Sequence, residues 1–472
     1  MASTHPSTFF FYDLETSGFS PRDDRIMQFA GQRTDMTLKP VGEPVNLLVK
    51  LTDDILPSPD AIMITGITPQ ATWNDGYSEK EFCELLLSDI FTPGTIAVGF
   101  NNVRFDDEFI RHTLWRNFYD PYEWAWSDGR GRWDMLDVVR MTRALRPDGM
   151  TWPVDESGKA VNKLELLASV NGLTHTRAHD ALSDVEVLIG VAQLIRQHQP
   201  KLFDYLLTLR DKKKVMELVN LDDPKPFVYT SGRYDPAHEK TTVAFPLAPG
   251  TKPGALLVYD LRHDPTQFLS ASPRQLASVI FADRDTRRTE GFVALPVKEL
   301  SYNRCPAVAP LGVLDEPTRE RLEISMETIT QHLATLSSNP TFGAAVREAF
   351  EMREPYEASL DVEHQLYDGF TPDGDKVRLA AVRESDETAL ADFHPQFADS
   401  RLEQLLLRYK ARQFPASLSE DEQSKWDAYR GQKLQAALPK YLADLSRLHE
   451  LGADGYLLKE LQLWAESIAP ID

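Results

Sequence analysis

The sequence predicts an α/β domain, then a small β-rich domain with helical appendages, then an all-α domain. Three observations predict this order. Roughly the first 200 residues contain both short apolar runs and helical patterns. From there to about residue 350, strand-like segments are separated by proline and glycine. Beyond that point the apolar residues recur at helical spacing. A chain of 472 residues accommodates several domains, and we place them at 8–198, 199–353 and 356–472.

The first domain is expected to hold a central sheet with flanking helices. Residues 9–14 and 96–100 are short apolar runs, typical of buried strands. Helical patterns cover 106–115 and 181–195, and the second of these repeats its apolar residues at i, i+3, i+4 and i+7. Pro200 is expected to end that helix.

The downstream elements are predicted from the same periodicities. In the middle domain we expect strands at 227–230, 242–245, 255–261 and 292–303, with helices at 275–280 and 317–336. In the last domain we expect helices at 402–411, 441–451 and 456–468. A further helix should begin at a capping box formed by Ser419 and Glu422 and continue through Trp426 and Tyr429.

Composition limits the class of protein. The two cysteines, Cys83 and Cys305, argue against a disulfide framework or a cysteine-ligated zinc site and fit a reducing compartment. With neither a signal-peptide pattern nor a run of about 20 apolar residues, we expect a cytoplasmic protein without membrane contact. The net charge of −21 opposes binding to a polyanion. A nucleic-acid enzyme of this charge must therefore cluster its basic residues along one groove.

The first candidate motif is Asp13-Leu14-Glu15 at the end of an apolar strand. Side chains alternate faces along a strand, so Asp13 and Glu15 point the same way. Two adjacent carboxylates repel each other unless a cation lies between them, and oxygen ligands of this kind suit Mg²⁺ or Mn²⁺. Taken alone, such a pair is more often a solvated strand end.

A second motif, Asn101 to Glu108, follows the next predicted strand and leads into a helix. Asp106 would deliver a third carboxylate from the helix start. Asp107 and Glu108 compete for this role, although acidic residues also occur at helix N-termini because they suit the helix dipole. We favour Asp106.

The third motif is His179 followed by Asp184 at the start of a helix. Asp184 lies about one turn into that helix, where its carboxylate can reach a metal, and His179 lies in the preceding loop. A histidine before a helix is more often a cap or a surface residue, and His175 has only that interpretation.

The order and spacing of the three motifs resemble the DEDD exonuclease superfamily, in its histidine-bearing DEDDh branch. The resemblance implies a ribonuclease H-like fold with a mixed sheet, and hydrolysis of nucleic acids from the 3′ end. Two metal ions about 4 Å apart would bind the scissile phosphate. Asp13, Glu15 and Asp184 would hold one metal, Asp13 and Asp106 the other, and His179 would take a proton from the attacking water.

The segment from Asn101 to Arg146 is rich in both arginine and aromatic residues. Its eight arginines and nine aromatics include half of the tryptophans, a mixture that suits a single-strand binder. The same segment holds eight acidic residues, so core aromatics with surface ion pairs are the alternative. We favour the groove interpretation, and we read Lys212 to Lys214 as a solvated helix face.

A closer resemblance, to the bacterial exonuclease I family, extends over essentially the whole chain. The segments that carry it are 101–108, 119–122, 133–140, 144–149, 178–185, 202–205, 363–370 and 409–415. It implies an SH3-like β-barrel in the middle domain and a helical C-terminal domain. It also implies that the three domains enclose a groove for single-stranded DNA, which makes the enzyme processive, that magnesium is required and that mononucleotides are released.

Matching positions carry further residues over from this family. DNA contacts are implied for Glu15, Arg111, Tyr122, Trp126, Arg140, Lys298, Asn303 and Tyr367. Lys163 stands where an arginine is expected, which keeps the charge but loses the bidentate fork. The family also binds the acidic C-terminal tail of the single-stranded DNA-binding protein, and the matching pocket residues are Arg146, Tyr205 and Lys225.

The resulting hypothesis is a 3′-to-5′ exodeoxyribonuclease for single-stranded DNA, acting in repair and recombination as a monomer with two Mg²⁺ ions, for which Mn²⁺ can substitute. One alternative is a proofreading or RNA-trimming DEDDh nuclease, which needs only the first domain. Another is a non-catalytic DNA-binding scaffold, which has no need of a complete metal site.

Overall fold

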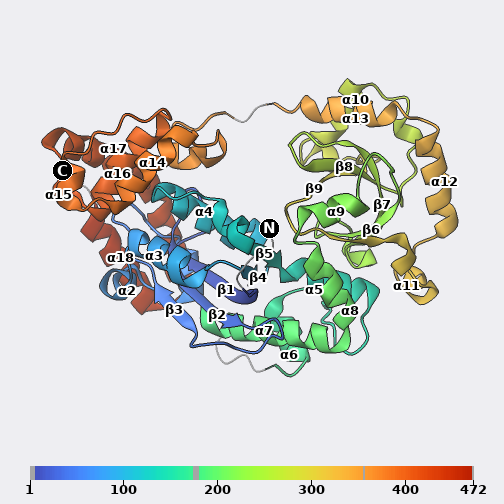
Figure 1. Ribbon diagram of the computed structural model, residues 1–472, viewed down its shortest axis with the longest axis horizontal. Coiled ribbons are helices and arrows are strands. Elements are labelled where there is room, and N and C mark those ends of the chain that lie inside the picture. The colour runs from blue at the N-terminus through green and yellow to red at the C-terminus, as the bar shows by residue number, and fades with distance from the viewer. Residues whose placement is uncertain (1–5, 174–179, 355–356, 470–472) are drawn as a thin grey trace. The chain divides into compact units, whose positions relative to one another are not determined.

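The computed structural model describes residues 6–173, 180–354 and 357–469 (Figure 1). The chain forms two compact units. Unit 1 comprises Met1–Arg132, His175–Ile189 and Ala358–Asp472, and unit 2 comprises Trp133–Thr174 and Gly190–Glu357. Unit 1 thus combines most of the predicted first domain with the predicted third. The three-domain boundaries themselves stay a prediction.

A mixed five-stranded sheet organises the N-terminal part of the chain. Its order is β3-β2-β1-β4-β5, and the strands are β1 (Thr8–Thr16), β2 (Ile26–Thr34), β3 (Val45–Leu48), β4 (Thr95–Gly99) and β5 (Gly131–Asp134). Strand β1 runs antiparallel to β2 and parallel to β4. The apolar runs at 9–14 and 96–100 therefore form adjacent central strands, as predicted.

Four helices of unit 1 lie between these strands in the chain, three between β3 and β4 and one between β4 and β5. They are α1 (Pro59–Thr65), α2 (Pro69–Asp75), α3 (Glu79–Leu85) and α4 (Asp106–Arg116). Aromatic side chains of β1 and β2 pack with those of α3 and α4 in one core. Helix α7 (Ala181–His198) begins in unit 1 and ends two residues before Pro200, which is the first residue of the next helix. The helices predicted at 106–115 and 181–195 are both confirmed.

The C-terminal part of unit 1 is helical, as predicted. Its helices are α14 (Asp373–Glu384), α15 (Glu387–Ala391), α16 (Arg401–Gln413), α17 (Glu420–Glu450) and α18 (Gly455–Ile468). The capping box of Ser419 and Glu422 is present. The expectation of separate helices before and after Pro439 is wrong, because α17 is a single 31-residue helix with Pro439 inside it. Buried Leu434 and Tyr441 anchor α17 on both sides of the proline, so packing outweighs the lost hydrogen bond.

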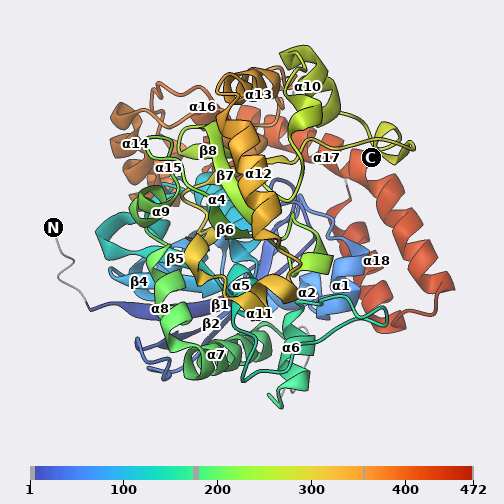
Figure 2. The same ribbon diagram turned by 90° about the vertical axis from the view of Figure 1, so that its right-hand side faces the viewer.

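Within unit 1, α17 packs against α1, and α18 packs against α1 and α2 (Figure 2). Tyr441 and Leu461 join Met27 and Ile62 in a shared core. The indole Nε1 of Trp464 donates to the carbonyl of Ile55 at 2.9 Å. The C-terminal helices therefore complete the core of the N-terminal segment.

No helix among the described residues is long and apolar enough to cross a membrane.

A buried charge cluster also joins these two parts of unit 1. It consists of Arg25, Asp54, Glu79, Glu363 and Arg412, whose side chains are at most 3% exposed. Glu363 accepts from Arg25 at 2.9 Å and pairs with Arg412 at 2.7 Å. Arg412 also pairs with Asp54 at 2.8 Å. Residues more than 300 positions apart thus neutralise one another away from water.

Unit 2 contains an antiparallel five-stranded sheet of order β10-β6-β7-β8-β9. The strands are β6 (Phe227–Thr230), β7 (Thr241–Pro249), β8 (Ala255–Asp260), β9 (Val297–Ser301) and β10 (Ala307–Pro310). The strand predicted at 292–303 is shorter than expected. Pro296, which has no N–H to donate to a ladder, directly precedes β9. Strand β10 was not predicted.

The helices of unit 2 come from both of its chain segments. They are α5 (Met135–Leu145), α6 (Leu164–Val170), α8 (Pro200–Thr208), α9 (Lys212–Leu218), α10 (Pro273–Ile280), α11 (Glu316–Arg321), α12 (Met326–Ser337) and α13 (Phe342–Glu351). Helix α10 lies beside α13 (Figure 2). The single helix predicted at 317–336 is wrong: Glu323 adopts a left-handed φ of 54°, and Ser325 caps a new helix.

Candidate active site

Three of the four predicted metal-binding carboxylates lie together. Asp13 and Glu15 come from the end of β1 and Asp184 from the first turn of α7, and one ligand atom of each lies within 4.8 Å of the others. Asp13 and Glu15 are two residues apart on one strand, opposite Ala30 and Gln28 of β2, so they share a face of the sheet. All three are partly buried. The arrangement offers a cation at least three oxygen ligands.

The electrostatics of this group favour a bound cation. Burial, followed by the negative charges of Asp13 and Asp184, raises the pKa of Glu15 to about 9. Asp180, one turn before Asp184, adds to this effect. Because the three carboxylates cannot all ionise side by side without a counter-charge, a divalent cation among them would favour their ionised forms. Oxygen-only ligands fit Mg²⁺ or Mn²⁺.

The second motif places three acidic side chains in different surroundings. Asp106 is the first residue of α4, is buried, and lies outside the group of three. Asp107 accepts hydrogen bonds from Tyr12 and Arg132. Glu108 pairs with Arg111 at 2.7 Å. Protein partners therefore hold both competitors of Asp106, and the role of Asp106 as a metal ligand stays a prediction.

His179, the predicted base, lies outside the described residues, as does His175. The chain is described again from Asp180, which immediately precedes α7. The role of His179 therefore rests on the sequence motif.

The arginine- and aromatic-rich segment is largely core, which corrects the favoured interpretation. Three of its four tryptophans are buried: Trp115, Trp124 and Trp133. Trp126 is 66% exposed. Several of its arginines are also buried and paired with acids, namely Arg116 with Glu79, Arg132 with Asp107 and Arg143 with Glu239. Sequence alone does not separate a stacking tryptophan from a packed one, because both are large and apolar.

Some of the predicted DNA contacts in unit 1 do gather. The guanidinium of Arg111 lies 5.7 Å from the centroid of the Tyr122 ring, and one of its nitrogens lies 3.5 Å from the hydroxyl of Tyr367. The rings of Tyr122 and Tyr367 are 6.4 Å apart. Sequence reasoning missed Phe370, whose ring is 85% exposed and 5.9 Å from that of Tyr122. Trp126 has no described contact with this group.

Two of the predicted contacts in unit 2 lie on strand β9 and on α5. The Nζ of Lys298 is 3.5 Å from the centroid of the Tyr234 ring. Burial lowers the pKa of Lys298 to about 8, although Asp260 opposes the shift. Arg140 of α5 pairs with Asp137 at 2.7 Å and lies over Gly232, where an added Cβ would stand 2.9 Å from its nitrogens.

Two further predicted contacts in unit 2 are exposed side chains. Lys163 immediately precedes α6, and Asn303 lies in the turn after β9. Their positions are compatible with a ligand but do not identify one.

The three residues predicted to form a pocket for an acidic tail make different contacts. Arg146 donates to the carbonyl of Val313 at 3.1 Å, and Tyr205 donates to the carbonyl of Val308 at 3.0 Å. Both side chains thus reach one short segment that includes the end of β10. Lys225 is exposed and pairs with Asp223 at 2.5 Å.

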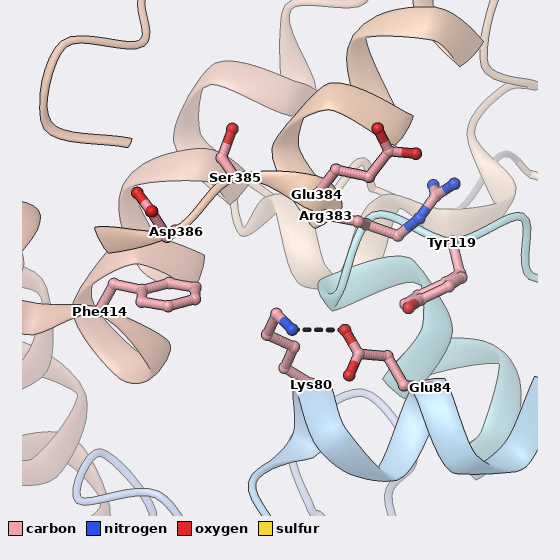
Figure 3. A pocket seen from close by; sticks show the side chains of 8 residues that line it. All are labelled: Lys80, Glu84, Tyr119, Arg383, Glu384, Ser385, Asp386 and Phe414. Atoms are coloured by element: carbon pink, nitrogen blue, oxygen red, sulfur yellow. Dashed lines mark hydrogen bonds and ion pairs between the residues drawn. The ribbon is translucent and has the colours of Figure 1, made fainter. Parts of the chain in front are cut away.

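A surface pocket of about 540 Å³ elsewhere in unit 1 contains none of the predicted site residues (Figure 3). Arg383 there stacks 4.5 Å from the Tyr119 ring and donates to the carbonyl of Phe118, and Lys80 pairs with Glu84. The lining residues are Lys80, Glu84, Tyr119, Arg383, Glu384, Ser385, Asp386 and Phe414. Since its cations are already satisfied and acids surround them, this pocket does not suit a phosphate.

Three family models match consecutive parts of the chain. An exonuclease model matches residues 10–192, the exonuclease I SH3-like domain matches 210–352, and the exonuclease I C-terminal domain matches 360–468. Exodeoxyribonuclease I of Haemophilus influenzae is 38% identical over 448 residues, covering 95% of each chain. Exodeoxyribonuclease I of Escherichia coli is 39% identical over 471 residues, covering 98% of each.

Solved structures agree with these matches. Escherichia coli exonuclease I in complex with a dA16 oligonucleotide superposes with a TM-score of 0.95 at 38% identity, covering 98% of this chain and 100% of that one. A zinc-bound complex of the same protein with single-stranded DNA superposes with a TM-score of 0.93 at 37% identity, with the same coverage. The mixed sheet, the SH3-like domain and the helical C-terminal segment all have counterparts, and this chain therefore belongs to the exonuclease I family.

Proposed function

We propose that this protein removes nucleotides from the 3′ end of single-stranded DNA by a two-metal mechanism. The observation that carries the proposal is the group of Asp13, Glu15 and Asp184, whose ligand atoms lie within 4.8 Å of one another. Membership of the exonuclease I family and the likeness to a DNA-bound relative support the substrate. Processive release of mononucleotides and a role in repair and recombination form part of the same proposal.

The roles of the side chains follow from their placement. When bound, divalent cations would lower the pKa of the attacking water and stabilise the leaving 3′ oxygen. Asp13, Glu15 and Asp184 would hold one cation, and Asp13 with Asp106 the other. His179 would accept the proton of the water, since an imidazole pKa near 6.5 suits a base at neutral pH.

We propose Mg²⁺ as the natural cofactor, with Mn²⁺ able to replace it. The donors available are carboxylate oxygens, which suit hard cations. Protein stripped with a chelator should lose activity, regain it with Mg²⁺ or Mn²⁺, and regain little with Ca²⁺. Full activity without any added cation would contradict the metal assignment.

We propose DNA contacts in unit 1 and, independently, in unit 2. In unit 1, Arg111, Tyr122, Tyr367 and Trp126 supply a cation and aromatic rings, the combination that holds single strands through phosphates and stacked bases. In unit 2, Arg140, Lys163, Lys298 and Asn303 supply cations and a polar side chain. Their basic groups would offset the net charge of −21 locally.

One assay tests the function against its alternatives. The full chain is incubated with Mg²⁺ and end-labelled single-stranded DNA, duplex DNA or RNA, beside Asp13→Asn, His179→Ala and the control Glu43→Gln, which alters an exposed carboxylate. We expect rapid shortening of single-stranded DNA from its 3′ end. Asp13→Asn and His179→Ala should lose at least about 100-fold in rate, because even changes beside a metal ligand cost 10–100-fold, and the control should match the wild type.

Each other outcome points elsewhere. RNA shortened as fast as DNA would favour a trimming nuclease. Binding without cleavage would favour a scaffold, and an active Asp13→Asn variant would overturn the metal site.

We also propose a protein partner. Arg146, Tyr205 and Lys225 match the family's pocket for the acidic tail of the single-stranded DNA-binding protein, and we propose that this chain, a monomer, binds that tail. A labelled tail peptide should bind the wild type and bind Arg146→Ala at least tenfold more weakly in fluorescence anisotropy. Light scattering should return the mass of one chain. Equal binding by both proteins would remove Arg146 from the pocket.

A further inference from the structure

Asp107 is a completely buried carboxylate that connects the segments bearing the metal ligands. Its Oδ1 accepts from the hydroxyl of Tyr12 at 2.7 Å and from the amide of Asn102 at 3.1 Å. Its Oδ2 accepts from Arg132 at 2.5 Å. These partners come from β1, from the turn before α4 and from β5. One side chain therefore ties the start of α4 to two strands of the sheet.

Two of the residues in this network are chain neighbours of predicted metal ligands. Tyr12 immediately precedes Asp13, and Asp107 immediately follows Asp106. The hydrogen bond between Tyr12 and Asp107 thus links the backbone that carries the first ligand to the backbone that carries the second. A metal pair requires its ligands to keep their separation to about 0.5 Å.

The start of α4 lacks the usual side-chain cap. Its N-cap residue, Phe105, has φ −129° and ψ −77° and makes no side-chain capping bond. Helices usually begin with a serine, threonine or aspartate whose oxygen accepts from the first turn. The bonds made by Asp107 join the first turn of α4 to β1 and β5.

We propose that Asp107 is a positioning residue that sets Asp106 relative to Asp13 and so fixes the geometry of the second metal ion. This inference rests on the two-metal function proposed above. Asp107 is not itself a ligand, because donors from the protein occupy both of its oxygens and its side chain is fully buried. The ion pair with Arg132 neutralises its charge inside the core.

A purely structural role for Asp107 makes a different prediction. A buried carboxylate with three partners stabilises the fold wherever it lies, so its loss would lower stability and leave the metal affinity of the folded protein unchanged. Asp54 is a matched case. It is also completely buried and accepts from Arg412 and Lys433, but it lies in the charge cluster and not between ligand-bearing segments.

The test measures Mn²⁺ binding to the full chain by electron paramagnetic resonance, without DNA, together with thermal unfolding. Asp107→Asn keeps the shape of the side chain and presents an amide to Arg132. We expect the wild type to bind two Mn²⁺ ions. In Asp107→Asn the dissociation constant of the second ion should rise by about 10–100-fold. Tyr12→Phe removes one hydroxyl and should raise the same dissociation constant by a smaller factor. This second variant tests the proposal if Asp107→Asn does not fold.

The control and the contrary results separate the two proposals. Asp54→Asn should lower the unfolding temperature while both Mn²⁺ constants stay within about twofold of the wild type. Unchanged Mn²⁺ constants in folded Asp107→Asn and Tyr12→Phe would overturn the positioning role. A wild type that binds fewer than two Mn²⁺ ions would instead contradict the two-metal function.

Discussion

Replacing Glu363 by glutamine should destabilise unit 1 by about 3–5 kcal/mol, the usual effect of removing one partner from a buried ion pair. The change keeps the size of the side chain and removes its charge. Three guanidinium groups then lose their common counter-ion: those of Arg412 at 2.7 Å, Arg25 at 2.9 Å and Arg408 at 3.3 Å.

The magnitude follows from these contacts. At an effective dielectric constant of about 20, each of the two shorter contacts contributes roughly 6 kcal/mol of attraction. Burying each ion costs several kcal/mol, which offsets much of that gain while the carboxylate is ionised. Once the carboxylate is gone the arginines still bear their burial cost, so the net loss lies within the range stated above.

The predicted loss has a defined pH dependence. Burial raises the pKa of Glu363, but Arg412 and Arg25 outweigh it and hold that pKa well below its usual range. A carboxyl whose folded pKa is depressed contributes stability at every pH above its unfolded value, near 4.3, and loses it only as the pH falls further. The difference between wild type and Glu363→Gln should therefore be the same at pH 6 and pH 8.

The assay is urea unfolding of the full chain, followed by tryptophan fluorescence at both pH values. Glu403→Gln is the control, because Glu403 is exposed on α16, and it should change the unfolding free energy by less than about 0.5 kcal/mol. If Glu363→Gln shifted the free energy no more than this control, the charge cluster would not stabilise unit 1 and the reasoning would be refuted.

Three further results are expected. Gly232→Ala should displace the guanidinium of Arg140, which lies over this glycine, and so weaken the binding of single-stranded DNA. The slope of log affinity against log salt should fall by about 0.7, while the unfolding temperature stays unchanged. An unchanged slope would remove Arg140 from the binding site. Trp126→Ala should weaken DNA binding by about 1–3 kcal/mol, whereas Tyr456→Ala, an equally exposed aromatic at 65% against 66%, should not, and equal effects would contradict stacking. The 2.8 Å pair between His364 and Asp23 raises the pKa of His364 and lowers that of Asp23 to about 2. His364→Gln should therefore lower the unfolding temperature most between about pH 4 and 6.5, and progressively less as His364 deprotonates above that range. A constant difference in unfolding temperature from pH 5 to pH 9 would argue against the ion pair.

Local patterns predicted the elements that a few neighbouring residues determine. The apolar run at 9–14 became a central strand, and the capping box at Ser419 began a long helix. The expectations failed where distant packing decides. Periodicity cannot show that buried side chains on both sides of Pro439 hold α17 together, or that a left-handed Glu323 divides a helical run.

The candidate site shows the same division. Order and spacing predicted which carboxylates meet, because a strand end and a helix start have fixed geometry. They favoured Asp106 over Asp107, but they could not show that Tyr12 and Arg132, both distant in sequence, bond to Asp107. Tryptophans that looked like stacking platforms are mostly core, because exposure depends on the whole fold.

The composition of unit 1 has a consequence for synthesis of the chain. Two of its buried residues, Arg25 and Asp54, form a first group whose partners Glu363, Arg412 and Lys433 form a second group far along the chain. A ribosome that adds about 5–20 residues per second makes the second group tens of seconds after the first. During that interval Arg25 and Asp54 lack these partners. The sheet that bears the candidate metal ligands thus reaches its final packing only when translation is nearly complete, which would delay nuclease activity until the whole enzyme exists.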